Sequence, residues 1–398
     1  MVVLNDWELI KETFVKQGEL FTGRPRQWGA EYPRGGWNGV IIVDGPKWKE
    51  QRRFTLHGLR DMGVGRAIME DYILEEIHHL VAGIEKQPSA DAGVLFAPYE
   101  PVQIFVGNVI NAVLFGQRFE DGGASITRLK ALLDGTGKTP IPVWKSLLLF
   151  TEYSKHLPFM KSIFDELDET FGQLHEFLAL QANELEKELT IDSTPKCLVE
   201  AYLQQLARIE KGEAEKGYFD RRQLSAIVLD LWIAGLETTT ATLTWLFIYL
   251  VHYPEIQAKL QAEIDANVDA DADVHGEHKA RLPYTTAFLM EGHQIAAVMR
   301  DERFFPRPSH FDPDRFLESD GVTVKKIEQF VPFSVGKRVC LGEALARAEL
   351  FLFVTNILKR FTVSKAPFEK MPSLEPRPTP ANVLPPPEPF TVLLKKRL

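Results

Sequence analysis

A long apolar stretch from Gln223 to Val251 dominates the sequence, and it stops at the pair Tyr253 and Pro254. A helix of this length that is hydrophobic on most sides is buried in a large core or crosses a membrane. Polar residues interrupt the stretch, and no run of about 18 or more apolar residues occurs in the chain. We therefore expect one long central helix that is buried on most faces.

Helical periodicity also marks most of the remaining chain, and no internal repeat is visible. Past Arg300 the helical pattern gives way to proline-rich coil, and two short β-rich runs follow near the end. The expected fold class is mainly α with a small β part. The predicted helices are Asn5 to Val15, one that starts near Pro46, Met62 to Lys86, Pro101 to Phe115, Lys161 to Thr190, Pro195 to Lys211 and Ile256 to Ala266, and the predicted strands are Phe361 to Ser364 and Phe390 to Lys395.

Charge and cysteine content exclude some functions. The formal net charge of −9 argues against nucleic acid as a partner. Only two cysteines occur, Cys197 and Cys340, so a disulfide framework is excluded and a reducing compartment is expected. We interpret Cys197 as a small residue that packs at a helix start. The first residues show neither a signal core nor a transit-peptide composition, so as written the chain is expected neither to span a membrane nor to be exported.

Cys340 lies in the segment PFSVGKRVCLGEALARAEL, after a basic pair and between two glycines. The residues that follow have a helical pattern, with Glu343 and Arg347 spaced as an ion pair, so Cys340 is predicted at a helix amino terminus. Unpaired N–H groups and the positive end of the helix dipole favour a thiolate there. Gly336 and Gly342 have no side chains, which lets a flat ligand approach the backbone closely.

Several roles are open to this thiol. A structural metal site or an iron–sulfur cluster needs more cysteines nearby than the chain has. A nucleophilic cysteine needs a positioned histidine base, and none of the ten histidines stands in a context that nominates it. A buried structural cysteine leaves the glycines and the basic pair unexplained. A single axial thiolate to a haem iron uses all of these features, because it needs one sulfur, close approach of a flat ring and cations for the propionates.

The ten residues from Phe333 to Gly342 resemble the F-x-x-G-x-R-x-C-x-G haem signature of the cytochromes P450. The resemblance implies that Cys340 is the proximal iron ligand and that Arg338 contacts a haem propionate. It also implies that Phe333 packs beside the sulfur, and that Gly336 and Gly342 belong to the haem-binding loop.

The long helix contains the stretch from Ala234 to Thr240, where a glycine and three threonines are poor choices for a helix interior. A threonine hydroxyl is expected to bond the carbonyl one turn back, with a bend and an opened groove as the result. A packing irregularity is the alternative explanation. The stretch resembles the P450 sequence A-G-x-[DE]-T-[TS], which implies that Glu237 and Thr238 form the acid–alcohol pair that delivers protons for oxygen activation. Ala234 and Gly235 then face the haem.

Other elements extend the resemblance over nearly the whole chain. Trp48 and Arg52 stand four apart on a predicted helix, a spacing that is often a surface stack. They match the P450 W-x-x-x-R, in which both side chains bond a propionate. The segment from Phe311 to Phe316 resembles the P-x-R-F element before the cysteine loop, and Phe21 to Pro25 is typical of the microsomal, drug- and lipid-oxidising branch.

Two features depart from the family pattern. Microsomal P450s start with a membrane anchor, a hinge and strands of a small sheet, whereas Met1 to Leu4 of this chain resemble the middle of that sheet. In addition, Glu291 matches the glutamate of the family's E-x-x-R helix, but Gln294 stands in place of the arginine. The residues from Gly292 onward resemble a turn that lies a few dozen positions further along in the family. A segment is therefore predicted to be missing between Glu291 and Gly292, and Arg300 is no substitute by spacing.

The resemblance implies a single P450 domain over residues 1–398 that holds haem b through Cys340. It implies monooxygenation of a lipophilic xenobiotic, fatty acid or steroid-like substrate with dioxygen, and electrons from NADPH through NADPH-cytochrome P450 reductase. It further implies attachment to the cytosolic face of the endoplasmic reticulum membrane. Two alternatives remain: a non-catalytic or misfolded product of a truncated transcript or gene model, and a haem-thiolate sensor. An intact pair of Glu237 and Thr238 favours oxygen activation over a sensor, and the gap favours the non-catalytic alternative.

Overall fold

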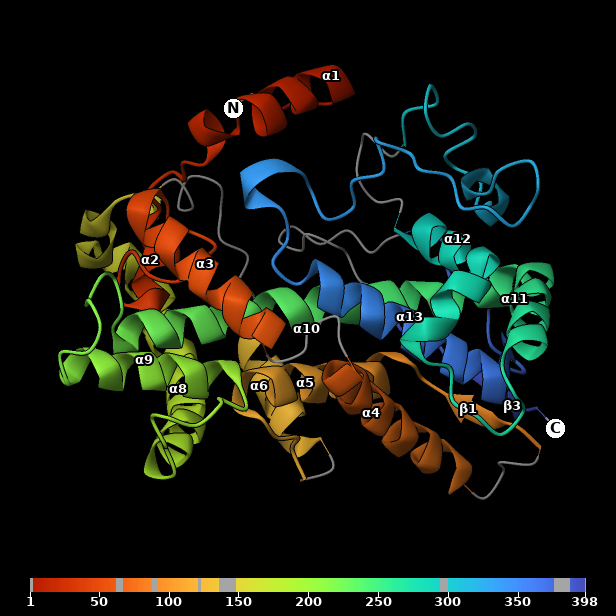
Figure 1. The fold of residues 1–398 in the computed structure, drawn as a ribbon, viewed down its shortest axis with the longest axis horizontal. Helices are drawn as coiled ribbons and strands as arrows, with labels where there is room; N and C mark the ends of the chain where they lie inside the picture. Colours follow the sequence, from red (N-terminus) through yellow and green to blue (C-terminus); the bar gives the residue numbers. More distant parts are fainter. Residues whose placement is uncertain are drawn as a thin grey trace. The chain divides into compact units, whose positions relative to one another are not determined.

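The computed structural model describes residues 3–61, 67–87, 92–120, 123–135, 148–293, 300–375 and 387–397. These residues are mostly helical with one small sheet, as predicted (Figure 1). The chain divides into two compact units. The first comprises Met1–Phe21, Gly65–Val106 and Leu236–Leu398, and the second comprises Thr22–Val64 and Gly107–Gly235.

The longest helix is α10 (Arg221–His252), which confirms the predicted central helix. It begins in the second unit and ends in the first, with the division between Gly235 and Leu236. Among the described residues it is the one helix long and apolar enough to cross a membrane, but 67% of its most apolar window is buried within the protein. This burial is the behaviour of a core helix.

In the first unit α13 (Glu343–Arg360) packs against α4 (Ala67–Glu85), α11 (Pro254–Asn267) and α12 (Pro283–Gly292). All residues of α13 from Glu349 to Leu358 are buried, which fits their nearly continuous apolar run. The short elements of this unit are α1 (Trp7–Ile10), the π-helix η1 (Lys11–Lys16), and the 3₁₀ helices η2 (Gly18–Phe21), η6 (Gly276–Arg281), η8 (Pro313–Phe316) and η9 (Gly336–Arg338).

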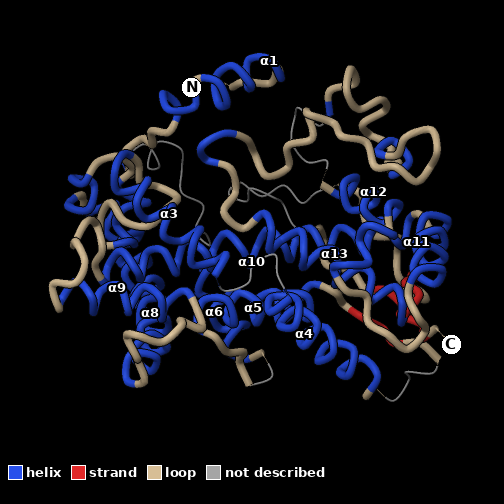
Figure 2. The backbone as a smooth tube through the Cα atoms, in the orientation of Figure 1, coloured by secondary structure: helices blue, strands red, loops and turns tan. Residues whose placement is uncertain are grey.

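The sheet of the first unit has three antiparallel strands in the order β1-β3-β2 (red in Figure 2). They are β1 (Val94–Phe96), β2 (Phe361–Lys365) and β3 (Val392–Lys396). Leu394 of β3 lies opposite Val94 on one side and Val363 on the other, and all three side chains are buried. This apolar row fixes the register, because a shift by one residue would turn it to solvent.

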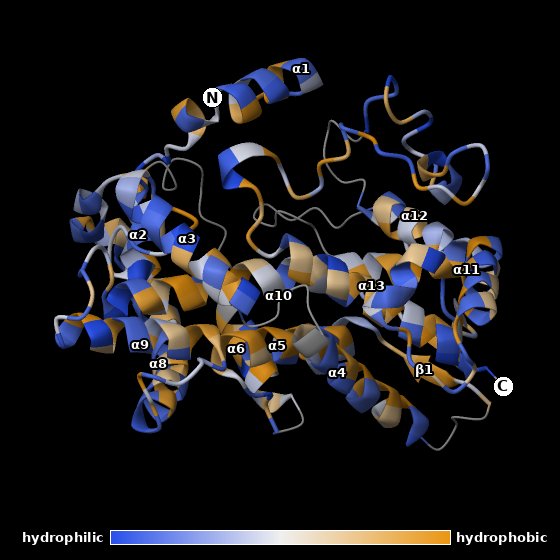
Figure 3. Cartoon of the chain, viewed as in Figure 1, coloured by the Kyte–Doolittle hydropathy of each residue, from blue (hydrophilic) through white to orange (hydrophobic). Residues whose placement is uncertain are grey.

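The second unit contains α3 (Gly45–Asp61), α6 (Ala124–Gly135), α8 (Lys161–Lys187) and α9 (Leu198–Glu210), with α8 packed on α6 and α9, and α3 packed on α9. Its short helices are α2 (Trp28–Glu31), η3 (Tyr32–Arg34), η4 (Glu152–His156) and η5 (Pro158–Met160). The helix α5 (Tyr99–Phe115) starts in the first unit and continues into the second, and its hydrophobic residues are almost all buried (orange in Figure 3).

A buried carboxylate fixes the loop before α3 within the second unit. Asp230 of α10 is 1% exposed and pairs with Arg34 at 2.7 Å. Its other oxygen accepts the N–H groups of Val40 and Ile41 at 2.8 and 3.0 Å. Gly39 has φ +95, and a Cβ there would lie 2.3 Å from the same carboxylate. The glycine therefore allows the loop backbone to reach Asp230.

Most predicted boundaries hold within a few residues. Asp6 caps α1 by accepting the N–H of Glu8 at 3.0 Å, as one of the two predicted caps. Cys197 is the buried residue before α9, where its sulfur accepts the N–H of Glu200 at 3.4 Å. Burial raises the pKa of the Cys197 thiol to about 11, so its role at a helix start is confirmed as structural. The start of the helix predicted from Met62 lies outside the described residues.

Candidate functional site

Cys340 stands between η9 and the first residue of α13, and its side chain is exposed. Its N–H donates to the carbonyl of Phe333 at 3.0 Å, which closes the loop that leads to the helix. The N-cap of α13 is Gly342, and no side chain caps the helix. The free N–H groups and the helix dipole therefore favour negative charge near the thiol. The predicted position of Cys340 at a helix amino terminus is confirmed.

The two glycines of the cysteine loop differ in what they accommodate. A Cβ at Gly342 would meet nothing within 4 Å, so open space borders the backbone there. Gly336 has φ +80, and a Cβ there would lie 1.9 Å from the carbonyl oxygen of Phe14 in η1. The expected room for a flat ligand is present at Gly342, whereas Gly336 is needed for close packing of the chain on itself.

Phe333 is held by two residues whose role the sequence did not reveal. The guanidinium carbon of Arg347 lies 4.8 Å from the ring centroid of Phe333, and the ring of His293 lies 5.5 Å away. Arg347 also pairs with Glu343 at 2.9 Å, as its spacing predicted. Burial lowers the pKa of His293 to about 4, so this ring is neutral at pH 7 and its Nδ1–H donates to the carbonyl of Leu289.

The positive charge of the basic pair before Cys340, Lys337 and Arg338, is partly neutralised by an acidic residue. Lys337 forms an ion pair with Glu19 at 3.2 Å, and both side chains are about half exposed. Arg338 is the last residue of η9 and is partly exposed. Its predicted contact with a propionate stays a prediction.

One face of α10 is uncovered in the middle of an otherwise buried helix. Ala234 and Thr238 are exposed, Gly235 and Glu237 are partly exposed, and the neighbour Leu236 is fully buried. Ala234, Gly235 and Thr238 share one helical face by their spacing. This open strip (Ala234, Gly235, Glu237 and Thr238) coincides with the residues that the resemblance assigns to the haem and to proton delivery.

The predicted back-bonding of threonine hydroxyls occurs one turn beyond the predicted stretch: within it, Thr239 donates to Glu349 instead, and the Thr240 hydroxyl has no hydrogen-bond partner among the described residues. The hydroxyl of Thr242 donates to the carbonyl of Thr238 at 2.9 Å, and the hydroxyl of Thr244 donates to that of Thr240 at 2.7 Å. The helix nevertheless continues from Arg221 to His252 without interruption. A Cβ at Gly235 would lie 2.8 Å from Ile110 of α5, so the glycine also serves helix packing in the second unit.

A buried carboxyl group on α13 lies beside these threonines. Glu349 is 2% exposed, and the hydroxyl of Thr239 donates to its Oε2 at 3.5 Å. Its Oε1 has no hydrogen-bond partner among the described residues. Burial raises the pKa of Glu349 to about 8, so the group is mostly protonated at pH 7. The sequence offered one unused signal, a glutamate directly before the apolar run that starts at Leu350.

Trp48 and Arg52 lie on the same side of α3, with the guanidinium carbon of Arg52 5.8 Å from the Trp48 ring. Trp48 is 4% exposed and Arg52 is partly exposed. The predicted stacking is present, and the predicted propionate contacts stay predictions. These two residues belong to the second unit, whereas the cysteine loop belongs to the first.

The glutamate before the predicted gap pairs with a buried arginine. The Arg315 Nε lies 2.8 Å from Glu291 Oε2, with side-chain exposures of 6% and 3%. The N–H of Asp312 donates to Glu291 Oε1 at 3.1 Å. Burial raises the pKa of Glu291 to about 7 although Arg315 opposes the shift. Arg300 is exposed, and Gln294 lies outside the described residues.

A haem requires a single accessible thiolate, room beside it and apolar or small groups that a flat ring can cover. Cys340, Gly342 and the open strip of α10 each meet one of these requirements. The chemistry of this donor set therefore fits the class of haem-thiolate proteins.

Comparison with known proteins identifies the family. The family model for cytochrome P450 matches residues 1–292 and 293–394, so the chain belongs to the cytochrome P450 family. It is 32% identical to cytochrome P450 2D28 of Mesocricetus auratus over 425 residues, covering 96% of this chain and 81% of the relative. It is 30% identical to cytochrome P450 2U1 of Bos taurus (100% and 77%) and 31% identical to cytochrome P450 2J2 of Homo sapiens (93% and 78%). Members of this family are haem-thiolate monooxygenases.

The family match divides within one residue of the predicted gap. It breaks between residues 292 and 293, and the junction was predicted between Glu291 and Gly292. The alignment with the 2D28 protein is 425 residues long although this chain has 398. Gaps in this chain account for the difference. Both observations support the absence of an internal segment.

Proposed function

We propose that the chain is a single-domain monooxygenase that acts on a lipophilic small molecule, with dioxygen and with electrons from NADPH through a flavoprotein reductase. The observation that carries the proposal is the exposed thiol of Cys340 at the uncapped start of α13. Its family membership and its similarity to the 2D, 2U1 and 2J2 proteins favour attachment to the endoplasmic reticulum.

In this proposal Cys340 would supply the thiolate ligand of haem, and Trp48, Arg52 and Arg338 would pair with its propionates. Ala234 and Gly235 would border the haem, and Phe333 would pack beside the sulfur. Haem with an axial thiolate supplies oxygen activation when it is bound. Thr238, an exposed residue, would donate the proton of its hydroxyl group, and Glu237 at the preceding position of α10 would replenish it.

The test is the spectrum of the reduced carbon monoxide complex in haem-loaded protein. Cys340→Ser replaces the soft donor, so the strongly red-shifted Soret band is expected to disappear. Cys197→Ser is the matched control, because that cysteine is buried at a helix start and serine is a good N-cap. Retention of the band in Cys340→Ser would show that another residue binds the iron.

A second candidate function is favoured by the break in the family match: a P450-like protein that does not load haem. The missing segment would remove the arginine of the family's E-x-x-R, a partner of the glutamate that matches Glu291. The two candidates differ in haem content, which is measured as the haem-to-protein ratio of soluble chain purified after expression with a haem precursor. A ratio near one supports the enzyme, and a ratio near zero supports the second candidate.

A further inference from the structure

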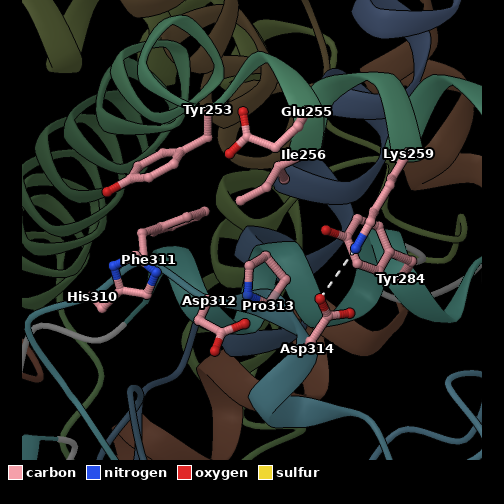
Figure 4. A pocket seen from close by; sticks show the side chains of 10 residues that line it. All are labelled: Tyr253, Glu255, Ile256, Lys259, Tyr284, His310, Phe311, Asp312, Pro313 and Asp314. Carbon is pink, nitrogen blue, oxygen red and sulfur yellow. Dashed lines mark hydrogen bonds and ion pairs between the residues drawn. The ribbon is translucent and has the colours of Figure 1, made fainter.

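A half-open pocket lies away from the cysteine loop, within the first unit. It has a volume of about 190 Å³ and forms where the first turns of α11 and α12 meet the segment from His310 to Asp314 (Figure 4). A volume of this size corresponds to about six water molecules. The pocket is therefore large enough for a small organic group.

One wall of the pocket is a stack of aromatic rings. The ring of Phe311 stacks on that of Tyr249, at 4.1 Å between centroids, and on that of Tyr253, at 5.4 Å. The two interplanar angles are 18° and 22°, and the edge of Phe288 packs on the same ring. Tyr253 and Phe311 both line the pocket, and a tyrosine ring can bind a cation.

The polar groups at the pocket are mainly acidic. Three carboxylates line it, those of Glu255, Asp312 and Asp314, against the one ammonium of Lys259. Asp314 pairs with Lys259 at 3.2 Å, and Asp312 pairs with Arg307 at 3.1 Å. Glu255 forms no ion pair with any residue that the structure describes. The pocket therefore keeps one uncompensated negative charge.

Tyr284 contributes a hydroxyl group that lacks a partner. The residue is 8% exposed, and its hydroxyl oxygen is buried without a hydrogen bond to any described residue. In Figure 4 this hydroxyl points into the pocket between Ile256 and Pro313. Burial and the nearby carboxylates raise the pKa of Tyr284 far above its usual value, so the hydroxyl stays neutral. A ligand with a hydrogen-bonding group would satisfy it.

Lys259 already shows how a cation binds in this pocket. Its ammonium lies 5.1 Å from the ring centroid of Tyr284 and pairs with Asp314. We propose that the pocket binds a second cation, the guanidinium or primary ammonium group of a small organic molecule or an arginine side chain. This cation lies on the face of Tyr253, pairs with Glu255 and donates an N–H to the hydroxyl of Tyr284.

Isothermal titration of the full, haem-loaded chain tests this proposal. The probes are butylguanidinium chloride, butylammonium chloride and the neutral isostere butylurea, all at constant ionic strength. Saturable binding is expected for the cations and not for butylurea. Equal binding of butylurea and butylguanidinium would overturn the proposal. A further arm uses acetyl-arginine amide: tighter binding than butylguanidinium assigns the site to an arginine side chain, and weaker binding assigns it to a small molecule.

Variants locate the binding site. Glu255→Gln, at an exposed position, should weaken butylguanidinium at least about threefold, and Lys259→Gln should strengthen it because the resident ammonium is removed. Glu318→Gln makes the same change of net charge at an exposed residue outside the pocket and should have no effect. Equal effects of Glu255→Gln and Glu318→Gln would show that only net charge matters and would refute the site.

Tyr284→Phe gives a readout that is independent of charge. It removes only the hydroxyl, so it should raise the melting temperature of the unliganded protein and weaken the cation at the same time. Unchanged affinity in Tyr284→Phe would exclude the proposed hydrogen bond and, with it, the proposed ligand geometry.

Discussion

Glu291 and Arg315 form an ion pair at 2.8 Å with both side chains almost completely withdrawn from water. Arg315 also donates to the carbonyls of Pro306, Arg307 and His310, so it joins the end of α12 to the segment that leads to the cysteine loop. Arg315→Met removes the charge partner and should lower the free energy of unfolding by about 3–5 kcal/mol. Urea denaturation measures this loss.

The double variant Glu291→Gln with Arg315→Met tests the cause of that loss. Because no buried charge is left unpaired, it should be more stable than Arg315→Met alone. If the double variant is the less stable of the two, the loss arises from the carbonyl hydrogen bonds of Arg315 and not from the orphaned carboxylate.

The buried carboxyl of Glu349 should make stability depend on pH. Its pKa rises from 4.5 to about 8 on folding, so the folded state holds its proton more tightly than the unfolded state. The protonated group makes its full contribution to the free energy of unfolding below pH 4.5, and this contribution is lost as the pH rises through 8. Between these two pH values the free energy of unfolding should fall as the pH rises. Glu349→Gln should make this fall shallower by up to about 1.4 kcal/mol for each pH unit. Urea denaturation from pH 5 to pH 9 measures the slope.

Glu277→Gln is the control for Glu349→Gln, since Glu277 is exposed in η6. Its stability profile should follow that of the parent chain. A slope in Glu349→Gln that equals the parent slope would mean that Glu349 is ionised in the folded protein.

The two loop glycines should respond differently to alanine. Gly336→Ala introduces a Cβ that would lie 1.9 Å from the Phe14 carbonyl, at φ +80, and should cost at least about 2 kcal/mol. Gly342→Ala meets open space and should change the stability of haem-free protein by less than about 0.5 kcal/mol. Haem retention should nevertheless fall in Gly342→Ala, because the methyl group enters the space beside the thiol. Similar stabilities of the two variants would contradict the packing of η1 on the cysteine loop.

Asp230 should be the most sensitive carboxylate of the second unit. Asp230→Ala leaves Arg34 and two backbone N–H groups without their acceptor and should cost about 3–5 kcal/mol. Asp168→Ala is the matched control, because Asp168 accepts an exposed hydrogen bond from Tyr32 and should cost less than about 1 kcal/mol. Limited proteolysis within residues 34–44 should accelerate in Asp230→Ala alone. Equal proteolysis rates would show that Asp230 does not hold this loop.

The central helix was predictable because its apolar residues occupy most of its faces and not a single stripe. The start of α13 was predictable because Cys340 and the glycines beside it precede a run of residues with helical spacing. The open strip of α10 was not predictable from apolar periodicity, since Ala234 and Gly235 are small and their type does not indicate whether a helix face is buried or exposed. Glu349 and His293 were missed for another reason. Their roles depend on residues far along the chain, such as Thr239, and no local pattern contains that information.

The contact between Phe14 and Gly336 has a consequence for how the chain is made. About 320 residues separate the two positions. At a synthesis rate of roughly 5–20 residues per second, η1 therefore waits between about 16 and 64 s for its partner to leave the ribosome. Leu9, Leu20 and Phe21 beside it are exposed even in the folded chain. During this interval the amino-terminal segment exposes apolar side chains that chaperones can bind.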